Sequence, residues 1–224
     1  MLKVLNILSS KSGGSFEVAN LIDKELRGDS RFINELRINS NFLGRLISSI
    51  ERKSLMNSYS KKNNLFIHLN YGYFEPVNSL SKFDIVNVHW TPNSTFGLKS
   101  VERLSKTTKV VISLHDFHFI TGGCHTPIGC ENFRDICDNC PLVDGYVKKE
   151  IVKKRKESID ALSENKNIFF VSPSSFVYNS FQAKNSFLIF NPIEKALKRK
   201  KVKDVDVLFF SDKKNWFIKG YDRL

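Results

Sequence analysis

Two apolar runs, each followed directly by a histidine, constrain most strongly what this chain can fold into. Residues 83–88 read FDIVNV and precede His89, and residues 108–114 read TKVVISL and precede His115. Continuous apolar runs of this length are typical of strands buried on both faces, as in a parallel sheet covered by helices. A helix predicted over residues 97–106 separates the two runs, which gives the strand–helix–strand order of a parallel unit.

The polar residues that follow these two strands are the candidate site residues. In open α/β sheets, ligands bind outside the carboxyl ends of the strands. We therefore expect His115 to contact a reacting substrate, with Asp116 orienting it and with His89 as the second choice. In the alternative interpretation, each histidine only caps its strand through a backbone hydrogen bond, and the carboxylate beside His115 is structural.

The same pattern extends over the rest of the chain and predicts the fold class. Apolar runs predict further strands, and helical spacing of apolar residues predicts helices between them. The expected strands cover residues 3–9, 66–70, 167–171, 187–190 and 206–210, and a long helix covers residues 148–162. The prediction is an α/β protein with a Rossmann-like parallel sheet and helices on both faces.

A glycine turn joins the first predicted strand to the first predicted helix. Gly13 and Gly14 let the chain turn tightly, and the helix that follows offers free N–H groups and a positive dipole end to an anion. The turn matches neither the dinucleotide-binding glycine fingerprint nor the P-loop. An equally weighted alternative is that it is only a turn.

All four cysteines lie between residues 124 and 140, with the spacing C-x5-C-x6-C-x2-C. Structural zinc sites use four nitrogen or sulfur ligands, and two intervening residues let a pair of thiolates face one ion. We therefore predict a structural zinc ion held by Cys124, Cys130, Cys137 and Cys140. Two disulfides and unligated thiols are the alternatives. His125 could replace one cysteine, but adjacent side chains rarely reach the same ion, so we expect it to face solvent or the cleft.

The compartment and the membrane relation follow from hydrophobic patterning. The apolar segment near the N-terminus is too short for the core of a signal peptide, which favours a cytoplasmic protein with reduced thiols. No apolar run reaches the roughly 18 residues of a transmembrane helix. The formal net charge of +12 favours anionic partners such as lipid headgroups and diphosphates.

One predicted helix combines an apolar stripe with basic residues. The stripe consists of Phe42, Leu43, Leu46, Ile47 and Ile50. A basic amphipathic helix can lie on the anionic inner face of the cell membrane. The alternative is a helix packed on the sheet through this stripe. Nucleic-acid binding is a weaker hypothesis, because basic runs such as residues 148–156 occur without a recognised nucleic-acid motif.

The combined motifs resemble those of one group of bacterial glycosyltransferases. The chain carries DIVNVHW at residues 84–90, LHD at 114–116, TGGCH at 121–125 and CDNCP at 137–141. This arrangement resembles the family-4-like, GT-B-fold enzymes that build surface polysaccharides such as colanic acid, capsule and O-antigen. The chain departs from the pattern at His118, where the group usually has an aromatic residue, and at Glu194, where its interdomain linker usually has aspartate.

The resemblance implies a function and site residues. It implies retaining transfer of a hexosyl group from a nucleotide sugar to a lipid-linked saccharide acceptor, with no metal ion in the chemistry. His115, Asp116 and His89 would then be catalytic. Gly13 and Gly14, together with Gly122, Gly123 and His125 of the cysteine loop, would line the substrate cleft.

The resemblance also implies a domain organisation. Residues 1–192 would form the N-terminal glycosyltransferase domain, residues 193–203 a linker, and residues 204–224 the start of a truncated C-terminal domain. A GT-B enzyme carries most of its nucleotide-sugar site in the second domain, so we expect weak or absent turnover from this chain alone. The alternative function is a catalytically inactive, zinc-stabilised remnant that binds a partner or a membrane.

Overall fold

The computed structural model describes residues 1–72 and 75–192. Within them, six parallel strands form one sheet in the order β2-β1-β3-β4-β5-β6. The strands are β1 (Leu2–Leu8), β2 (Phe32–Ile38), β3 (Ile85–Val88), β4 (Lys109–Ser113), β5 (Ile168–Ser172) and β6 (Ser186–Leu188). The linker, the second-domain segment and the strand predicted over 206–210 lie outside the described residues.

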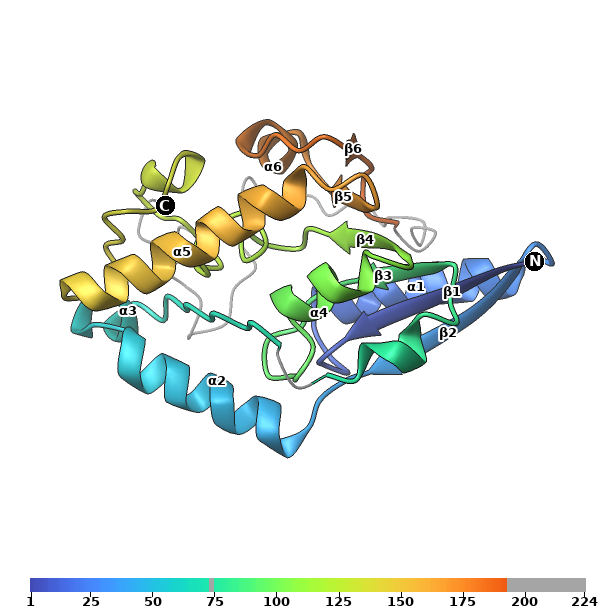
Figure 1. Cartoon of the computed structure of the whole chain (residues 1–224), viewed down its shortest axis with the longest axis horizontal. Coiled ribbons are helices and arrows are strands. Elements are labelled where there is room, and N and C mark those ends of the chain that lie inside the picture. The colour runs from blue at the N-terminus through green and yellow to red at the C-terminus, as the bar shows by residue number, and fades with distance from the viewer. Residues whose placement is uncertain (73–74, 193–224) are drawn as a thin grey trace, which may run out of the picture.

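Helices flank this sheet, as the α/β prediction requires (Figure 1). They are α1 (Gly14–Arg27), α2 (Phe42–Leu55), α3 (Ser58–Lys62), α4 (Leu98–Leu104), α5 (Tyr146–Ser163) and α6 (Ser175–Ser180), with 3-10 turns η1 (Val77–Leu80) and η2 (Asn132–Arg134). The connection from β1 to β2 runs toward one edge of the sheet, and the connection from β3 to β4 runs toward the opposite edge. Since crossovers between parallel strands are right-handed, α1 and α4 lie on opposite faces of the sheet.

The central strands contribute one fully apolar face to the core. In β3 and β4, Val86, Val88, Val110 and Ile112 on that face are completely buried. The two apolar runs are strands, as predicted, but their other face is less apolar than expected, because it carries the polar side chains of Asn87 and Ser113. The residues after these strands meet at one edge of the sheet, since β3 and β4 are parallel neighbours.

Two sequence predictions differ from the structure at the strand level. The edge strand β2, FINELRI, was not predicted, because its charged residues interrupt the apolar pattern and its side chains are only partly covered. The short strand predicted over residues 66–70 is reduced to a single antiparallel bridge between Ile67 and Cys124. That bridge still matters, because it ties the cysteine loop to the segment before β3.

Helix α2 packs against the domain with the face opposite to its apolar stripe. Gly44 and Ser48 are on the buried face, and a Cβ on Gly44 would come within 2.5 Å of the Ser94 backbone. The stripe points outward instead: the exposed fractions of Phe42, Leu43, Leu46 and Ile50 are 75%, 44%, 45% and 56%. The alternative in which the stripe packs on the sheet is therefore wrong.

Helix α5 is basic along its length, but two of its cations face inward. Arg155 is completely buried and Lys156 is 4% exposed. The guanidinium of Arg155 donates to the backbone carbonyls of Leu69, His118 and Thr121. Arg155 therefore joins three loop carbonyls under the helix and holds the chain that leads from β4 into the cysteine loop.

Candidate functional site

An open cavity of about 610 Å³ lies at the carboxyl edge of the sheet. Four segments form it: the turn between β1 and α1 with the first residues of α1, the end of β3, the end of β4, and the residues after β6. Its lining consists of Ser10, Ser12, Gly14, Ser15, Glu17, Val18, Trp90, His115, Asp116 and Asn191. This is the position where open α/β sheets bind ligands, beside the N-terminus of α1.

The structure brings His89 and His115 into direct contact at this edge. His89 Nδ1 and His115 Nε2 are 2.8 Å apart, and the two rings stack with centroids 5.1 Å apart. His89 is 1% exposed and does not line the cavity, whereas the His115 ring does. His115 can therefore contact a ligand in the cavity, and the buried His89 contacts the His115 ring on its other side.

Asp116 is held by a different set of partners from the expected one. Its carboxylate accepts hydrogen bonds from His125 Nδ1 at 2.6 Å, Trp90 Nε1 at 3.1 Å and the His118 backbone N–H at 2.8 Å. Burial alone would raise the pKa of Asp116, but His125 and these hydrogen bonds lower it below its usual value. None of these hydrogen bonds goes to His115, so the predicted orientation of that ring by Asp116 would act through the charge of Asp116, which raises the pKa of His115 against the effect of burial.

His125 faces this edge of the sheet and is occupied on both ring nitrogens. In addition to Asp116, it contacts His68, whose Nδ1 lies 2.8 Å from His125 Nε2. Burial, followed by the nearby His125, lowers the pKa of His68 to about 3, so His68 is neutral at physiological pH. The Asp116–His125–His68 chain ties the start of the cysteine loop to the end of β4.

The four candidate glycines fall into two groups. Gly13 has a φ of +90°, and a Cβ on either Gly13 or Gly14 would meet no atom of residues 1–72 and 75–192 within 4 Å, so these residues leave both glycines open at the start of α1. Gly122 and Gly123 are buried instead. A Cβ would come within 2.4 Å of Val152 at Gly122 and within 2.5 Å of the His68 carbonyl at Gly123. These two glycines allow close backbone packing and do not line the open cavity.

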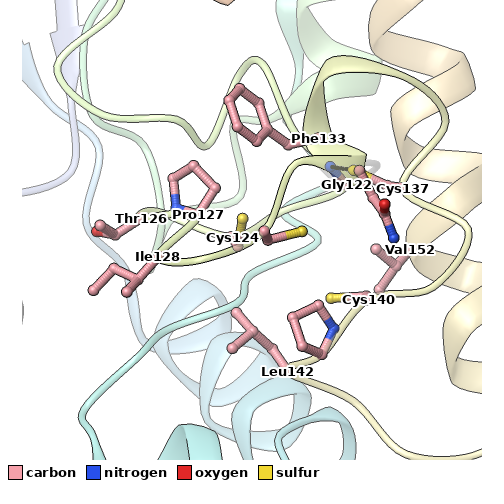
Figure 2. Close-up of a pocket in the computed structure, with 13 residues that line it drawn as sticks. Gly122, Cys124, Thr126, Pro127, Ile128, Phe133, Cys137, Cys140, Leu142 and Val152 are labelled. Carbon is pink, nitrogen blue, oxygen red and sulfur yellow. Dashed lines mark hydrogen bonds between the residues drawn. The ribbon is translucent and has the colours of Figure 1, made fainter.

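All four cysteines line a second, small cavity of about 20 Å³ (Figure 2). Figure 2 shows Cys124, Cys137 and Cys140 around the same space, with Val152 of α5 beside them. The cysteines are free thiols, so the disulfide alternative is not what the structure contains. Within residues 1–72 and 75–192, no group of three or more His, Cys, Asp or Glu side chains has the arrangement of a metal site.

The environment of the thiols contains both burial and positive charge. Burial raises the pKa of Cys140 to about 11 and raises that of Cys124 further. Burial also raises the pKa of Cys137. Two neighbours oppose this rise: the Gly122 N–H, which lies 3.4 Å from the Cys137 Sγ, and the nearby Lys156 ammonium. As buried thiols are poorly ionised without a cation, an ion bound here would have to displace their protons.

Sequence reasoning missed several residues that build the site. Trp90 was named only as part of a motif, and His68, His118 and Arg155 were given no place at the site. His118 is buried and contacts the His68 carbonyl at 3.1 Å and Arg155 Nη2 at 3.0 Å. These contacts join segments that are far apart in the sequence, so local spacing carries no signal for them.

Comparisons with known proteins give no family assignment: no family model, curated protein or solved structure matches this chain. In the part of the chain that the structure describes, no helix is long and apolar enough to cross a membrane. The interpretation of the site therefore depends on its own geometry and on the sequence motifs.

The buried histidines make stability depend on pH. Burial, followed by nearby His115, lowers the pKa of His89 to about 3, and burial, followed by nearby Arg155, lowers that of His118 well below 6.5. The unfolded chain therefore binds more protons below pH 6.5. We expect the free energy of unfolding to fall by about 1 kcal/mol between pH 6.5 and 5.5 for each such histidine, because the unfolded histidine becomes protonated over this range and the folded one does not.

Urea unfolding at pH 7.5, 6.5 and 5.5 measures this dependence. The His89→Gln variant should lose its share of the slope, while keeping the part due to the other buried histidines. A free energy of unfolding that stays constant between pH 7.5 and 5.5 would contradict the prediction.

Proposed function

We propose that this chain is the N-terminal domain of a GT-B-type glycosyltransferase that acts on a nucleotide sugar and a lipid-linked saccharide. The observation that carries the proposal is the open cavity at the carboxyl edge of the sheet, where His115 and Trp90 face the turn at Gly14. An indole and an imidazole suit a sugar ring and its hydroxyls, and the N-terminus of α1 suits a phosphate group. Two of the glycosyltransferase-like motifs, DIVNVHW at residues 84–90 and LHD at 114–116, have their last residues in the lining of this cavity.

In the proposed reaction, the residues of this chain bind and orient. His115 would accept a hydrogen bond from a sugar hydroxyl, and His89 would hold its ring. The backbone N–H groups of Gly14 and Ser15 at the start of α1 would favour the negative charge that develops on the leaving phosphate. Asp116 would keep Trp90 and His125 in place at the wall of the cavity.

A transfer assay tests this proposal. The purified chain is incubated with radiolabelled nucleotide hexoses and with a polyprenyl-diphosphate-linked N-acetylglucosamine, and label in the lipid fraction is counted. We expect transfer that falls at least roughly 100-fold in His115→Ala, because a contact to the reacting sugar is lost. Tyr178→Phe on α6, outside the cavity, is the control. Weak transfer at most is expected from this chain alone, so a folded protein that shows neither transfer from any hexose donor nor binding of a nucleotide sugar would favour the non-catalytic alternative.

We also propose that the cysteine loop holds a structural zinc ion. The supporting observations are the shared cavity of the four thiols and the buried cations beside it. A zinc ion with four thiolates carries a net charge of about −2, which Arg155 and Lys156 would balance. When bound, zinc would supply a fixed geometry to residues 121–141, and its closed shell would leave no position for substrate.

The exposed stripe of α2 supports a third part of the proposal, docking on an anionic bilayer. Phe42, Leu46 and Ile50 recur at helical spacing on the outward face, and Lys53 beside them is also exposed. Lys61 and Lys62 add positive charge at the end of α3, the helix that follows α2 in the chain. Apolar side chains with basic neighbours are the pattern of helices that lie in the interface of an anionic membrane. A lipid-linked acceptor would be reached from that surface.

Vesicle flotation tests the docking. On vesicles that contain phosphatidylglycerol, we expect Ile50→Glu to lower binding about tenfold, since it removes buried apolar area and adds a repelled charge. Thr107→Glu adds the same charge at the end of α4 and should bind within about twofold of the wild type. Equal binding of Ile50→Glu and wild type, or equal binding to uncharged vesicles, would contradict the docking.

A further inference from the structure

A row of buried and half-buried polar side chains crosses the sheet on the face that α1 covers. Asn34 of β2, Asn6 of β1 and Asn87 of β3 lie on neighbouring strands, and Ser113 of β4 continues the row. Asn6 is completely buried and Asn87 is 8% exposed. Buried amides require hydrogen-bond partners, so their orientations are mutually dependent.

Asp23 of α1 fixes the direction of this row. Its carboxylate is paired with Arg27, whose Nε donates to it at 2.7 Å. An ionised carboxylate only accepts hydrogen bonds. The side chain of Asn34 lies 2.5 Å from Asp23 Oδ1 and 3.5 Å from the Asp23 carbonyl. Because both neighbours are acceptors, Asn34 must turn its NH₂ group toward Asp23 and its oxygen toward Asn6.

The orientation of Asn34 determines the orientation of each following side chain in the row, because each hydrogen bond needs one donor and one acceptor. Asn34 Oδ1 accepts from Asn6 Nδ2 at 3.0 Å, so Asn6 presents its oxygen on the other side. Asn6 Oδ1 lies 2.9 Å from Asn87 Nδ2 and 3.2 Å from His89 Nε2. The Asn6 oxygen can only accept, so His89 Nε2 carries the proton.

His89 and His115 are the last members of this row of hydrogen bonds. With its proton on Nε2, the neutral His89 ring has a lone pair on Nδ1, which lies 2.8 Å from His115 Nε2. His115 Nε2 must then donate, and its Nδ1 is the unprotonated nitrogen. Among the described residues no hydrogen bond to His115 Nδ1 is present, and the ring lines the open cavity. Burial lowers the pKa of His115, which favours this neutral form.

We propose that Asp23 is a positioning residue that fixes His115 in the Nε2–H tautomer through Asn34, Asn6 and His89. The site then offers the cavity a hydrogen-bond acceptor at His115 Nδ1, so it selects ligands that donate a hydroxyl there. The assignment to a sugar hydroxyl rests on the proposed function, whereas the tautomer does not.

Long-range ¹H–¹⁵N spectra of the full chain at pH 7.5 measure the tautomer directly, because protonated and unprotonated ring nitrogens resonate far apart. The chain has five histidines, and His115→Gln assigns the His115 signals. We expect the Nε2–H form for both His89 and His115 in the wild-type protein. An Nδ1–H form of His115 would overturn the proposal, whatever the result of the transfer assay.

Asp23→Asn tests the role of the carboxylate with a side chain of the same shape. An amide can donate or accept, so both directions of the row become possible, and the Nδ1–H fraction of His115 should rise roughly tenfold or more. Asp29→Asn removes a surface carboxylate paired with Arg31 and should leave the spectrum unchanged. Unchanged His89 and His115 tautomers in a folded Asp23→Asn protein would overturn the role of Asp23. If that variant does not fold, the His115 tautomer measured in the wild-type protein decides whether the proposal stands.

Discussion

Replacement of Arg155 by methionine is expected to lower the free energy of unfolding by about 3–5 kcal/mol. Arg155 is completely buried and its guanidinium serves the carbonyls of Leu69, His118 and Thr121. Methionine fills much of the same volume but donates no hydrogen bond. The three carbonyls would then lose this donor, each at a cost of about 1–3 kcal/mol before relaxation, whereas His118 Nε2 would keep its contact with the His68 carbonyl.

Among the residues that the structure describes, the hydrogen-bond partners of this buried cation are carbonyls and a histidine ring, and no carboxylate. Burial lowers the pKa of Arg155 to about 10, and nearby Tyr71 and Glu51 oppose that shift, so the guanidinium stays charged at pH 7. The charge-assisted bonds to carbonyls explain why the loops before β3 and after β4 converge on α5. Loss of Arg155 should therefore loosen the wall of the cavity as well as the core.

Lys154→Met on the same helix is the matched control. Lys154 is exposed, so its replacement should change the free energy of unfolding by less than about 0.5 kcal/mol. Urea unfolding monitored by circular dichroism measures both variants. An Arg155→Met protein within 1 kcal/mol of the wild type, as judged against the roughly 3–5 kcal/mol expected, would show that the carbonyls find other partners.

Replacement of Cys140 by serine is expected to lower zinc affinity by roughly 100-fold or more, because a direct thiolate ligand is lost. Cys140 is 7% exposed and lines the cavity that the other cysteines share. In the wild-type protein we expect one zinc ion per chain by elemental analysis. Chelation should lower the thermal unfolding temperature, since the binding free energy of a structural metal contributes to folding.

Asp138→Asn provides the control for the cysteine variant. Asp138 is exposed in the same loop and leaves all four thiols in place, so it should keep the zinc content of the wild type. A wild-type protein purified with well below one zinc per chain after growth with added zinc would contradict the metal site. So would full zinc retention by Cys140→Ser.

The fold was predictable because its central strands are short runs dominated by apolar residues. β3 and β4 were found within one or two residues at each end, since a buried parallel strand has no competing pattern. Edge strand β2 was missed, because the partly solvated face of an edge accepts charged residues such as Glu35 and Arg37. The periodicity also could not predict which side of α2 faces solvent. It shows that a helix has an apolar side, but not what that side contacts.

The site was predictable only as far as strand ends determine it. The ends of neighbouring parallel strands must meet, which placed His89 and His115 together. The partners of Asp116 depend on how the chain returns at residues 121–125, and no local pattern encodes that path. The same holds for the polar row from Asp23 to Asn6, where each residue looks like an ordinary surface or strand residue in the sequence.

The most direct test of the account is the location of a bound nucleotide sugar. In ¹H–¹⁵N spectra of the full chain titrated with uridine diphosphate glucose, we expect shifts at the amides of Gly13, Gly14 and Ser15 and at the Trp90 indole. His115→Ala should reduce the Trp90 shift while the spectrum stays folded. Absence of shifts at millimolar ligand, or shifts confined to residues outside this cavity, would contradict the proposed substrate site.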